Sequence, residues 1–305
     1  MAERAAGRYA PSPSGDLHLG NLRTALLAWL FARSTGRRFL MRVEDLDRVR
    51  PGAEQRQLAD LAALGLDWDG PVVRQSERLD LYGHAIDRLR AQGRTYECFC
   101  TRKEIQQAAT APHGPMGSYP GTCRTLTTAD RARLRAEGRP AALRLRADIT
   151  EYEIVDELHG VYRGLVDDVV LRRGDGLPAY NLAVVVDDAD QHIDQVVRGD
   201  DLLPSTPRQA YLAALLGLPV PRYAHVPLVL NAAGQRLAKR DGSVTLADRT
   251  ALGDTVEDVV SALSCSLGYS ARTPAHLLRQ FDPAVLPRRP STFDENGLLQ
   301  PDGCP

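Results

Sequence analysis

The first 45 residues predict a strand, a helix and a second strand. A short stretch of strand length at 8–11 leads into a loop of Ser, Pro and Gly, and residues 39–43 form a second such stretch. Between them, apolar residues from Leu22 to Leu30 recur at the three- and four-residue spacing of one helical face. A strand–helix–strand crossover is right-handed, so its strands run parallel and a ligand crevice forms at their carboxyl ends. The segment therefore predicts an α/β protein with a Rossmann-like parallel sheet.

The rest of the chain continues this alternation, with one exception. The stretch 95–139 holds three of the five cysteines and has no long apolar period, which indicates an inserted element held together by something other than a core. Elsewhere, the pattern predicts helices at 53–66, 77–92 and 206–217, and strands at 141–146, 184–186, 196–198 and 224–230.

Charge and hydropathy exclude several classes of protein. Lys and Arg number 38 against 39 Asp and Glu, a formal net charge of −1, which excludes a generally basic nucleic-acid binder but leaves room for a local basic face. The chain has no run of about 18 apolar residues, and its start lacks the apolar segment of a secretory signal. We therefore expect a cytoplasmic, globular protein that does not enter a membrane. A monomer is expected as well.

Two loops have the composition of a phosphate site. Residues 15–21 directly precede a helix N-terminus, whose free backbone donors and dipole favour an anion, and they add His18 as a donor and Gly20 for close approach. Residues 235–242 follow an apolar strand and contain Lys239, which with Lys103 makes up all the lysines of the chain. Both loops lie at one edge of a parallel sheet, so we expect them to converge on one triphosphate. A P-loop is absent, and the glycine spacing is not that of a dinucleotide fold.

The paired loops resemble the two signatures of class I aminoacyl-tRNA synthetases. Segments 8–15, 42–47 and 180–188 are further similar to the glutamyl branch, and the resemblance covers residues 8 to about 245. The chain departs from the fullest signatures in having Asn21 for a second His and Ala238 for a Ser, and the lost hydroxyl puts fast turnover in doubt. The resemblance implies catalytic roles for His18, Gly20, Asn21 and Lys239. It implies that ATP, accompanied by Mg²⁺, is bound by His18, Gly20, Asn21, Arg236, Leu237, Ala238, Lys239 and Arg240.

A glutamate substrate needs cations for two carboxylates and an anion for its ammonium group. Arg suits the first task because its planar fork holds a carboxylate through two hydrogen bonds. On the residues alone, Arg8 and Arg198 fit a solvated surface better than a binding pocket in so Arg-rich a chain, and Glu44 fits a helix cap. The resemblance implies a glutamate pocket formed by Arg8, Tyr9, Ala10, Pro11, Ser12, Glu44, Tyr180 and Arg198.

The cysteine-rich segment has the donor set of a structural metal site. Cys98, Cys100 and Cys123 supply three thiolates, and a closed four-ligand zinc site would hold together a segment without a core. The resemblance implies Tyr119 as the fourth ligand, while His113 is the alternative on residue type alone. Three unbound loop cysteines are the remaining interpretation. We expect one zinc ion per chain.

The resemblance also implies the reaction. A discriminating synthetase of the glutamyl branch carries a further anticodon-binding domain, for which this chain is too short. Its shortened architecture resembles members that activate L-glutamate with ATP, without tRNA, and transfer it to the queuosine base at the wobble position of tRNA(Asp). The alternatives are a truncated synthetase that charges a tRNA 3′ end, a nucleotidyltransferase of the same superfamily that acts without tRNA, and a silent RNA-binding paralogue.

The same resemblance divides the chain into four regions. We expect the first half of the catalytic domain at 1–94, a zinc-binding insertion at 95–140, the rest of the insertion with the second half of the catalytic domain at 141–245, and a small helical region at 246–305. Six arginines are candidates for RNA phosphate contacts, although a run of charge is more often only a solvated face. They are Arg131, Arg133, Arg135, Arg139, Arg172 and Arg173.

Overall fold

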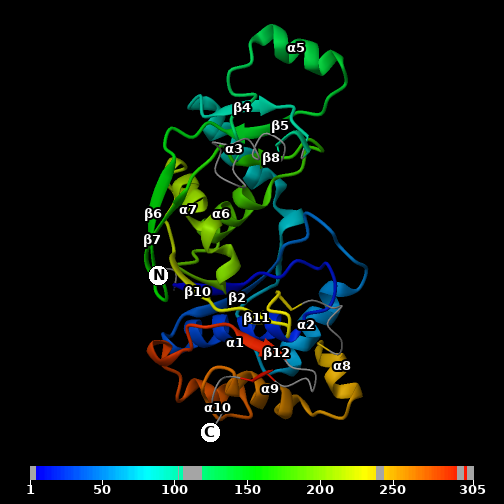
Figure 1. The fold of residues 1–305 in the computed structure, drawn as a ribbon, viewed down its shortest axis with the longest axis vertical. Coiled ribbons are helices and arrows are strands. Elements are labelled where there is room, and N and C mark those ends of the chain that lie inside the picture. Colours follow the sequence, from blue (N-terminus) through cyan, green and yellow to red (C-terminus); the bar gives the residue numbers. More distant parts are fainter. Residues whose placement is uncertain (1–4, 102, 106–118, 238–243, 294–298, 301–305) are drawn as a thin grey trace.

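The centre of the protein is a parallel sheet assembled from two halves (Figure 1). The computed structural model describes residues 5–101, 103–105, 119–237, 244–293 and 299–300. The strands of the first half are β1 (Ala6–Tyr9), β2 (Arg38–Val43) and β3 (Val73–Arg74), which pair in parallel in that order. The strands of the second half are β9 (Gln195–Gly199), β10 (Arg222–Val226) and β6 (Glu151–Asp156), all parallel, with β7 (Gly160–Leu165) antiparallel at the edge.

The two halves meet at the start of β1. Ala6 forms a parallel bridge with Ile193, and its carbonyl accepts a 3.0 Å hydrogen bond from the Asp194 amide. Helix α1 (Leu19–Ser34) connects β1 to β2, and its residues Leu22, Leu26 and Leu30 are completely buried. This arrangement places the loops after β1, β9 and β10 at one edge of the sheet, as the sequence predicts.

The remaining elements cover the sheet or extend from it. The insertion holds a three-stranded antiparallel sheet and the helix α5, which lies at the end of the molecule opposite the last helices (Figure 1). Its elements are β4 (Thr95–Cys98), β5 (Ala142–Leu145), β8 (Val170–Arg172) and α5 (Thr128–Ala136). The other described helices and strands are α2 (Ala53–Ala63), η1 (Gln75–Glu77), α3 (Leu79–Ala91), α6 (Tyr180–Asp190), η2 (Asp200–Ser205), α7 (Thr206–Leu215), β11 (Val229–Leu230), α8 (Leu246–Ala251), α9 (Val256–Cys265), α10 (Pro274–Leu278), η4 (Pro283–Val285), β12 (Ser291–Phe293) and β13 (Leu299–Gln300).

The prediction of a strand at 184–186 is wrong, because these valines lie in α6. Every residue from Leu182 to Val186 is buried, so this turn of helix is apolar on all sides and lacks the helical period. Valine disfavours a helix by less than about 1 kcal/mol, which burial against α3 and α7 outweighs. The predicted strand at 224–230 is interrupted after Val226 by Pro227, which has no amide to donate.

The C-terminal region contains helices α8, α9 and α10, as predicted, and also the strands β12 and β13, which the sequence did not indicate. β12 pairs in parallel with β11, so this region is joined to the segment that follows β10 through Val229 and Leu230, in a separate small sheet. None of the helices within the described residues has both the length and the apolar character needed to cross a bilayer. The division into four regions stays a prediction.

Candidate active site

The first signature forms the N-terminus of α1. His18 is the N-cap residue, and its Nδ1 accepts a 3.2 Å hydrogen bond from the Asn21 amide. The Asn21 side chain accepts in return from the His18 amide at 3.3 Å. Asn21 stands where the fullest form of the signature has a second His. Because Asn21 completes this reciprocal cap, it still provides a polar side chain that orients His18. The Tyr9 hydroxyl donates to the Asn21 carbonyl, so this residue supports the helix end, and its place in the glutamate pocket stays a prediction.

Gly20 is required by the close approach of two neighbours. A Cβ atom at this position would lie 3.0 Å from the His18 ring and 3.3 Å from the Val229 Cβ atom. Any larger residue would therefore push the imidazole away from the helix end or separate α1 from β11. The small residue keeps the His18 ring and the backbone donors of the helix on one surface, an arrangement that favours an anion.

The described residues on either side of 238–243, Leu237 and Val244, are hydrogen-bonded to residues in or next to the first signature. The Leu237 amide donates to the Val229 carbonyl at 3.1 Å, and the Leu237 side chain is buried. Arg236 forms a 2.6 Å ion pair with Asp201. Downstream, the Leu19 amide donates to the Val244 carbonyl at 2.8 Å. Ala238, Lys239 and Arg240 lie outside the described residues.

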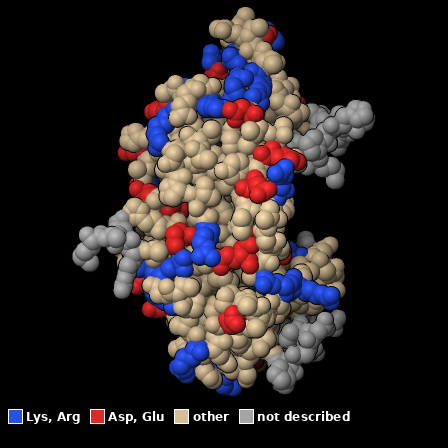
Figure 2. Space-filling model, turned by 90° about the vertical axis from the view of Figure 1, so that its left-hand side faces the viewer, with Lys and Arg blue, Asp and Glu red and all other residues tan. Residues whose placement is uncertain are grey.

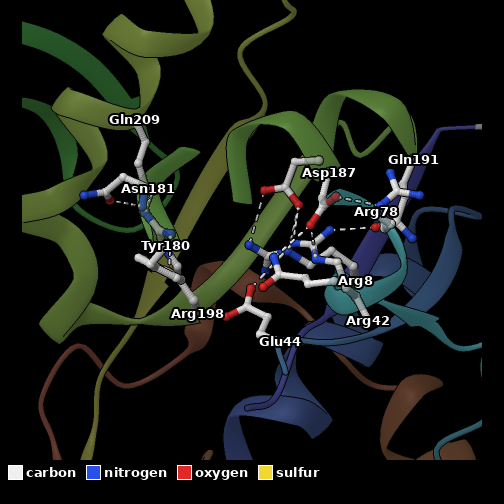
Figure 3. A network of polar contacts seen from close by, with 12 residues as sticks. Arg8, Arg42, Glu44, Arg78, Tyr180, Asn181, Asp187, Gln191, Arg198 and Gln209 are labelled. Atoms are coloured by element: carbon white, nitrogen blue, oxygen red, sulfur yellow. Dashed lines mark hydrogen bonds and ion pairs between the residues drawn. The ribbon is translucent and has the colours of Figure 1, made fainter. Parts of the chain in front are cut away.

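A chain of alternating charges runs from the end of β1 to α3 (Figure 3). Asp188 accepts from Arg8 at 3.2 Å and from Arg42 at 2.7 Å. Asp187 in turn lies 3.6 Å from Arg42 and 2.7 Å from Arg78. Arg8 is thus buried and fixed by a carboxylate, not solvated. Arg42, Asp187 and Asp188 stand inside the segments that resemble the glutamyl branch, but the sequence alone did not single them out as site residues.

Glu44 is the carboxyl group of this region that is least neutralised. Its pKa is raised to about 7 by burial, against which the nearby Arg42 and Arg8 act in the opposite direction. The nearest cation, Arg42 Nη2, lies 3.8 Å away. By contrast, burial is overcome at Asp188, where the Arg8 and Arg42 guanidinium groups hold the pKa below its usual range. A bound ammonium group beside Glu44 would favour its ionised form.

Arg198 is buried in a wholly neutral set of acceptors. Its Nε donates to His225 Nε2 at 3.1 Å, and its Nη2 donates to Thr206 at 2.8 Å and to Gln209 at 2.7 Å. Its Nη1 has one long contact, 3.5 Å to the Tyr180 hydroxyl. Only 6% of the residue is exposed, and no carboxylate in the described part of the chain forms an ion pair with it. A buried cation without a counter-ion is costly unless an anion binds to it.

Four of the predicted glutamate residues lie near one another: Arg8, Glu44, Tyr180 and Arg198. Figure 3 places the Glu44 carboxyl group between the Arg198–Tyr180 pair and the Arg8–Arg42 pair. The predicted segment 10–12 is held beside Glu44, since the Pro11 carbonyl accepts from the Glu44 amide at 3.0 Å. The arrangement offers one carboxylate receptor, Arg198, and a nearby anion, Glu44, which are two of the three charged groups that an amino acid with an acidic side chain needs.

Three cysteine sulfurs of the insertion form a cluster suited to one metal ion. The Sγ atoms of Cys98, Cys100 and Cys123 lie within 4.8 Å of one another. The Tyr119 hydroxyl is 3.3 Å from the Cys98 sulfur and 3.6 Å from the Cys100 sulfur. Tetrahedral zinc with bonds of about 2.3 Å spaces its sulfur ligands about 3.8 Å apart, so the donors fit such an ion. His113 lies outside the described residues.

Most of the candidate RNA-binding arginines are paired with carboxylates. Arg133 lies 3.2 Å from Glu137, Arg135 pairs with Glu97, and Arg139 lies 2.8 Å from Glu104. Arg173 is paired with Asp47 and Asp175. Figure 2 shows basic and acidic side chains interspersed at the upper end of one face, above a broad uncharged area. Phosphate contact by these arginines stays a prediction.

Comparison with known proteins agrees with this geometry. The family described as tRNA synthetases class I (E and Q), catalytic domain, matches residues 5–285. The glutamyl-Q tRNA(Asp) synthetase of Nocardia farcinica is 76% identical over 300 residues, which are 98% of this chain and 96% of that protein. The one from Cutibacterium acnes is 55% identical over 279 residues, covering 90% of this chain and 79% of that protein.

A solved structure shares the fold. The glutamate tRNA ligase from Elizabethkingia meningosepticum, in complex with its amino acid, superposes with a TM-score of 0.81 at 28% identity and covers 97% of this chain and 68% of that ligase. One assignment follows from the parallel sheet, the two signature segments and the 76% identity to the Nocardia protein over 98% of this chain. The chain belongs to the class I tRNA synthetases of the E and Q type and, among these, to the glutamyl-Q tRNA(Asp) synthetase family.

Proposed function

We propose that the protein activates L-glutamate with ATP in the absence of tRNA and transfers the glutamyl group to the queuosine base at the wobble position of tRNA(Asp). The proposal that glutamate is the amino-acid substrate rests on Arg198, whose guanidinium group is buried and has no ion pair among the described residues. The two relatives named above carry the proposal of the acceptor, since their names specify a modified tRNA(Asp).

The site residues have distinct roles in this reaction. Arg198 binds one substrate carboxylate, while Glu44, which is anionic above a pKa of about 7, binds the ammonium group. His18 and the N-terminal amides of α1 bind the phosphates, and Lys239 supplies a cation to the same group. Mg²⁺ accompanies ATP and neutralises phosphate charge when bound.

The chemistry needs no nucleophile from the protein. A carboxylate oxygen of glutamate attacks the α-phosphorus of ATP, and pyrophosphate leaves. A ring hydroxyl of queuosine then attacks the carbonyl of the acyl adenylate, AMP leaves, and the hydroxyl proton is lost. Catalysis therefore rests on positioning and on stabilisation of the charge that develops at phosphorus.

Transfer of labelled glutamate, with ATP, tests the acceptor. We expect label on tRNA(Asp) that contains queuosine and none on tRNA(Asp) without it. Label on the 3′ end of tRNA(Glu) would instead identify a truncated glutamyl-tRNA synthetase. Pyrophosphate release without label on any RNA would favour a nucleotidyltransferase, and binding of tRNA without pyrophosphate release would favour a silent paralogue.

We propose further that Cys98, Cys100, Tyr119 and Cys123 hold one structural zinc ion. The support is the spacing of the three sulfurs and the phenol oxygen. Cys123→Ser should reduce bound zinc from one equivalent to near none. It should also lower the unfolding temperature, because the segment loses a ligand of the metal ion that we propose holds it together. Elemental analysis of protein purified without chelator measures this. Thr122→Ser, at the exposed neighbouring position, is the matched control.

The fourth ligand is decided by a second pair of variants. If Tyr119 is the ligand, Tyr119→Phe weakens zinc retention against a chelator, and His113→Ala does not. The reverse result would assign His113. Absence of zinc from the unmodified protein would contradict the metal site altogether.

A further inference from the structure

Arg198, His225 and Asp156 form a buried chain of hydrogen bonds across three neighbouring strands, which we call the relay. Arg198 on β9 stands opposite His225 on β10 in the strand register, and Asp156 lies on β6, the next strand in the sheet. His225 Nδ1 lies 2.6 Å from Asp156 Oδ2, and its Nε2 accepts from Arg198 Nε at 3.1 Å. His225 is completely buried and Asp156 is 2% exposed. None of the reaction steps above uses either side chain.

The two contacts fix the tautomer of the imidazole. Arginine Nε can only donate, so His225 Nε2 must present its lone pair and carry no proton. The single proton of the neutral ring is then on Nδ1, where it is donated to Asp156. Asp156 is itself held by three backbone amides, those of Leu158, His159 and His225, at 2.9, 3.0 and 3.1 Å. The carboxylate therefore has a fixed position and orients the ring.

This arrangement also settles which edge of Arg198 is available. His225 occupies Nε, while Thr206 and Gln209 occupy both protons of Nη2. Only the Nη1 side, near Tyr180, lacks a short hydrogen bond. Because all these acceptors are neutral, they orient the guanidinium and leave its charge for a bound anion. A carboxylate at the position of His225 would orient Arg198 equally well but would neutralise it.

We propose that His225, held by Asp156, is a positioning residue for substrate recognition: it orients Arg198 and keeps its positive charge available for a carboxylate of glutamate. The inference rests on the proposed function, because it assumes that Arg198 binds the substrate. His225 does not touch the substrate, and its effect is confined to the amino-acid half of the site. It leaves the ATP half, at the N-terminus of α1, unaffected.

The test compares two substitutions at this position by glutamate-dependent pyrophosphate exchange. His225→Leu removes the acceptor while retaining similar volume, and we expect the KM for glutamate to rise about 10-fold to 100-fold, the loss typical of a hydrogen bond to a charged group. The KM for ATP should change less than about twofold. His225→Gln restores an acceptor at the place of Nε2, so it should recover most of the glutamate affinity. His276→Leu, the same change at an exposed position on α10, is the control.

Each further outcome has a definite meaning. An unchanged KM for glutamate in His225→Leu, together with a raised KM in Arg198→Lys, would overturn the positioning role while sparing the proposed pocket. An unchanged KM in both variants would overturn the pocket as well. If His225→Leu does not fold, His225→Gln alone decides. A similar rise in the KM for glutamate and in the KM for ATP, together with a lowered unfolding temperature, would indicate a purely structural role and contradict the proposal.

Discussion

Arg198→Leu should lower kcat/KM for glutamate by about a thousandfold while changing the affinity for ATP little. The substitution removes a buried cation whose hydrogen-bond partners are all neutral, and with it the two charged hydrogen bonds that we propose Nη1 donates to the substrate carboxylate. Each such bond contributes about 1.5–3 kcal/mol, and 1.4 kcal/mol corresponds to about a factor of ten in rate. Glutamate-dependent pyrophosphate exchange measures the loss, and direct ATP binding provides the second readout.

Two control variants separate recognition from folding. Arg222→Leu removes an exposed arginine from β10, the strand next to Arg198, where its partner is Glu157. It should leave exchange unchanged, because an exposed ion pair contributes about 1 kcal/mol or less. Arg198→Lys keeps the charge without the planar fork and should fall between the wild type and Arg198→Leu. Wild-type exchange in Arg198→Leu would show that glutamate binds elsewhere.

The sequence was sufficient where local chemistry determines the structure. The apolar period from Leu22 to Leu30 predicted α1, and the residues of the first signature predicted its N-terminus, where His18 and Asn21 form the reciprocal cap. The strand β2 also follows from its own composition, whereas β1 begins two residues before the predicted range 8–11. In each case the interactions that decide the conformation lie within a few residues of one another.

The sequence was insufficient where distant residues decide the outcome. Arg8 and Asp188 are 180 positions apart and Arg42 and Asp188 are 146 apart, so no local pattern pairs them. The relay from Asp156 to Arg198 needs three strands to be placed side by side, which only the sheet order provides. The valines at 184–186 show the same limit, since burial against α3 and α7, not their preference for strands, sets the conformation of α6.

Lys239→Ala should reduce adenylate formation by about a thousandfold without altering the affinity for glutamate. In the proposed reaction this lysine supplies a cation to the negative charge that develops as pyrophosphate leaves, and one such group contributes about a hundredfold to a thousandfold in rate. The segment that contains it is tied at Leu237 to β11 and at Val244 to Leu19, which confines its ends to the side of His18. Single-turnover formation of the adenylate measures the step directly.

The composition of the chain provides an unusually direct control for this variant. Lys103, in the insertion, is the sole other lysine in the sequence, and it is exposed. Lys103→Ala makes the same chemical change away from the signatures and should leave adenylate formation intact. Near wild-type exchange in Lys239→Ala would refute the role assigned to the lysine. If, in addition, Arg240→Ala lost most of the adenylate formation, the role would belong to the neighbouring guanidinium. Arginine carries the same charge as lysine, but its planar and more weakly hydrated group can donate two hydrogen bonds to a phosphate.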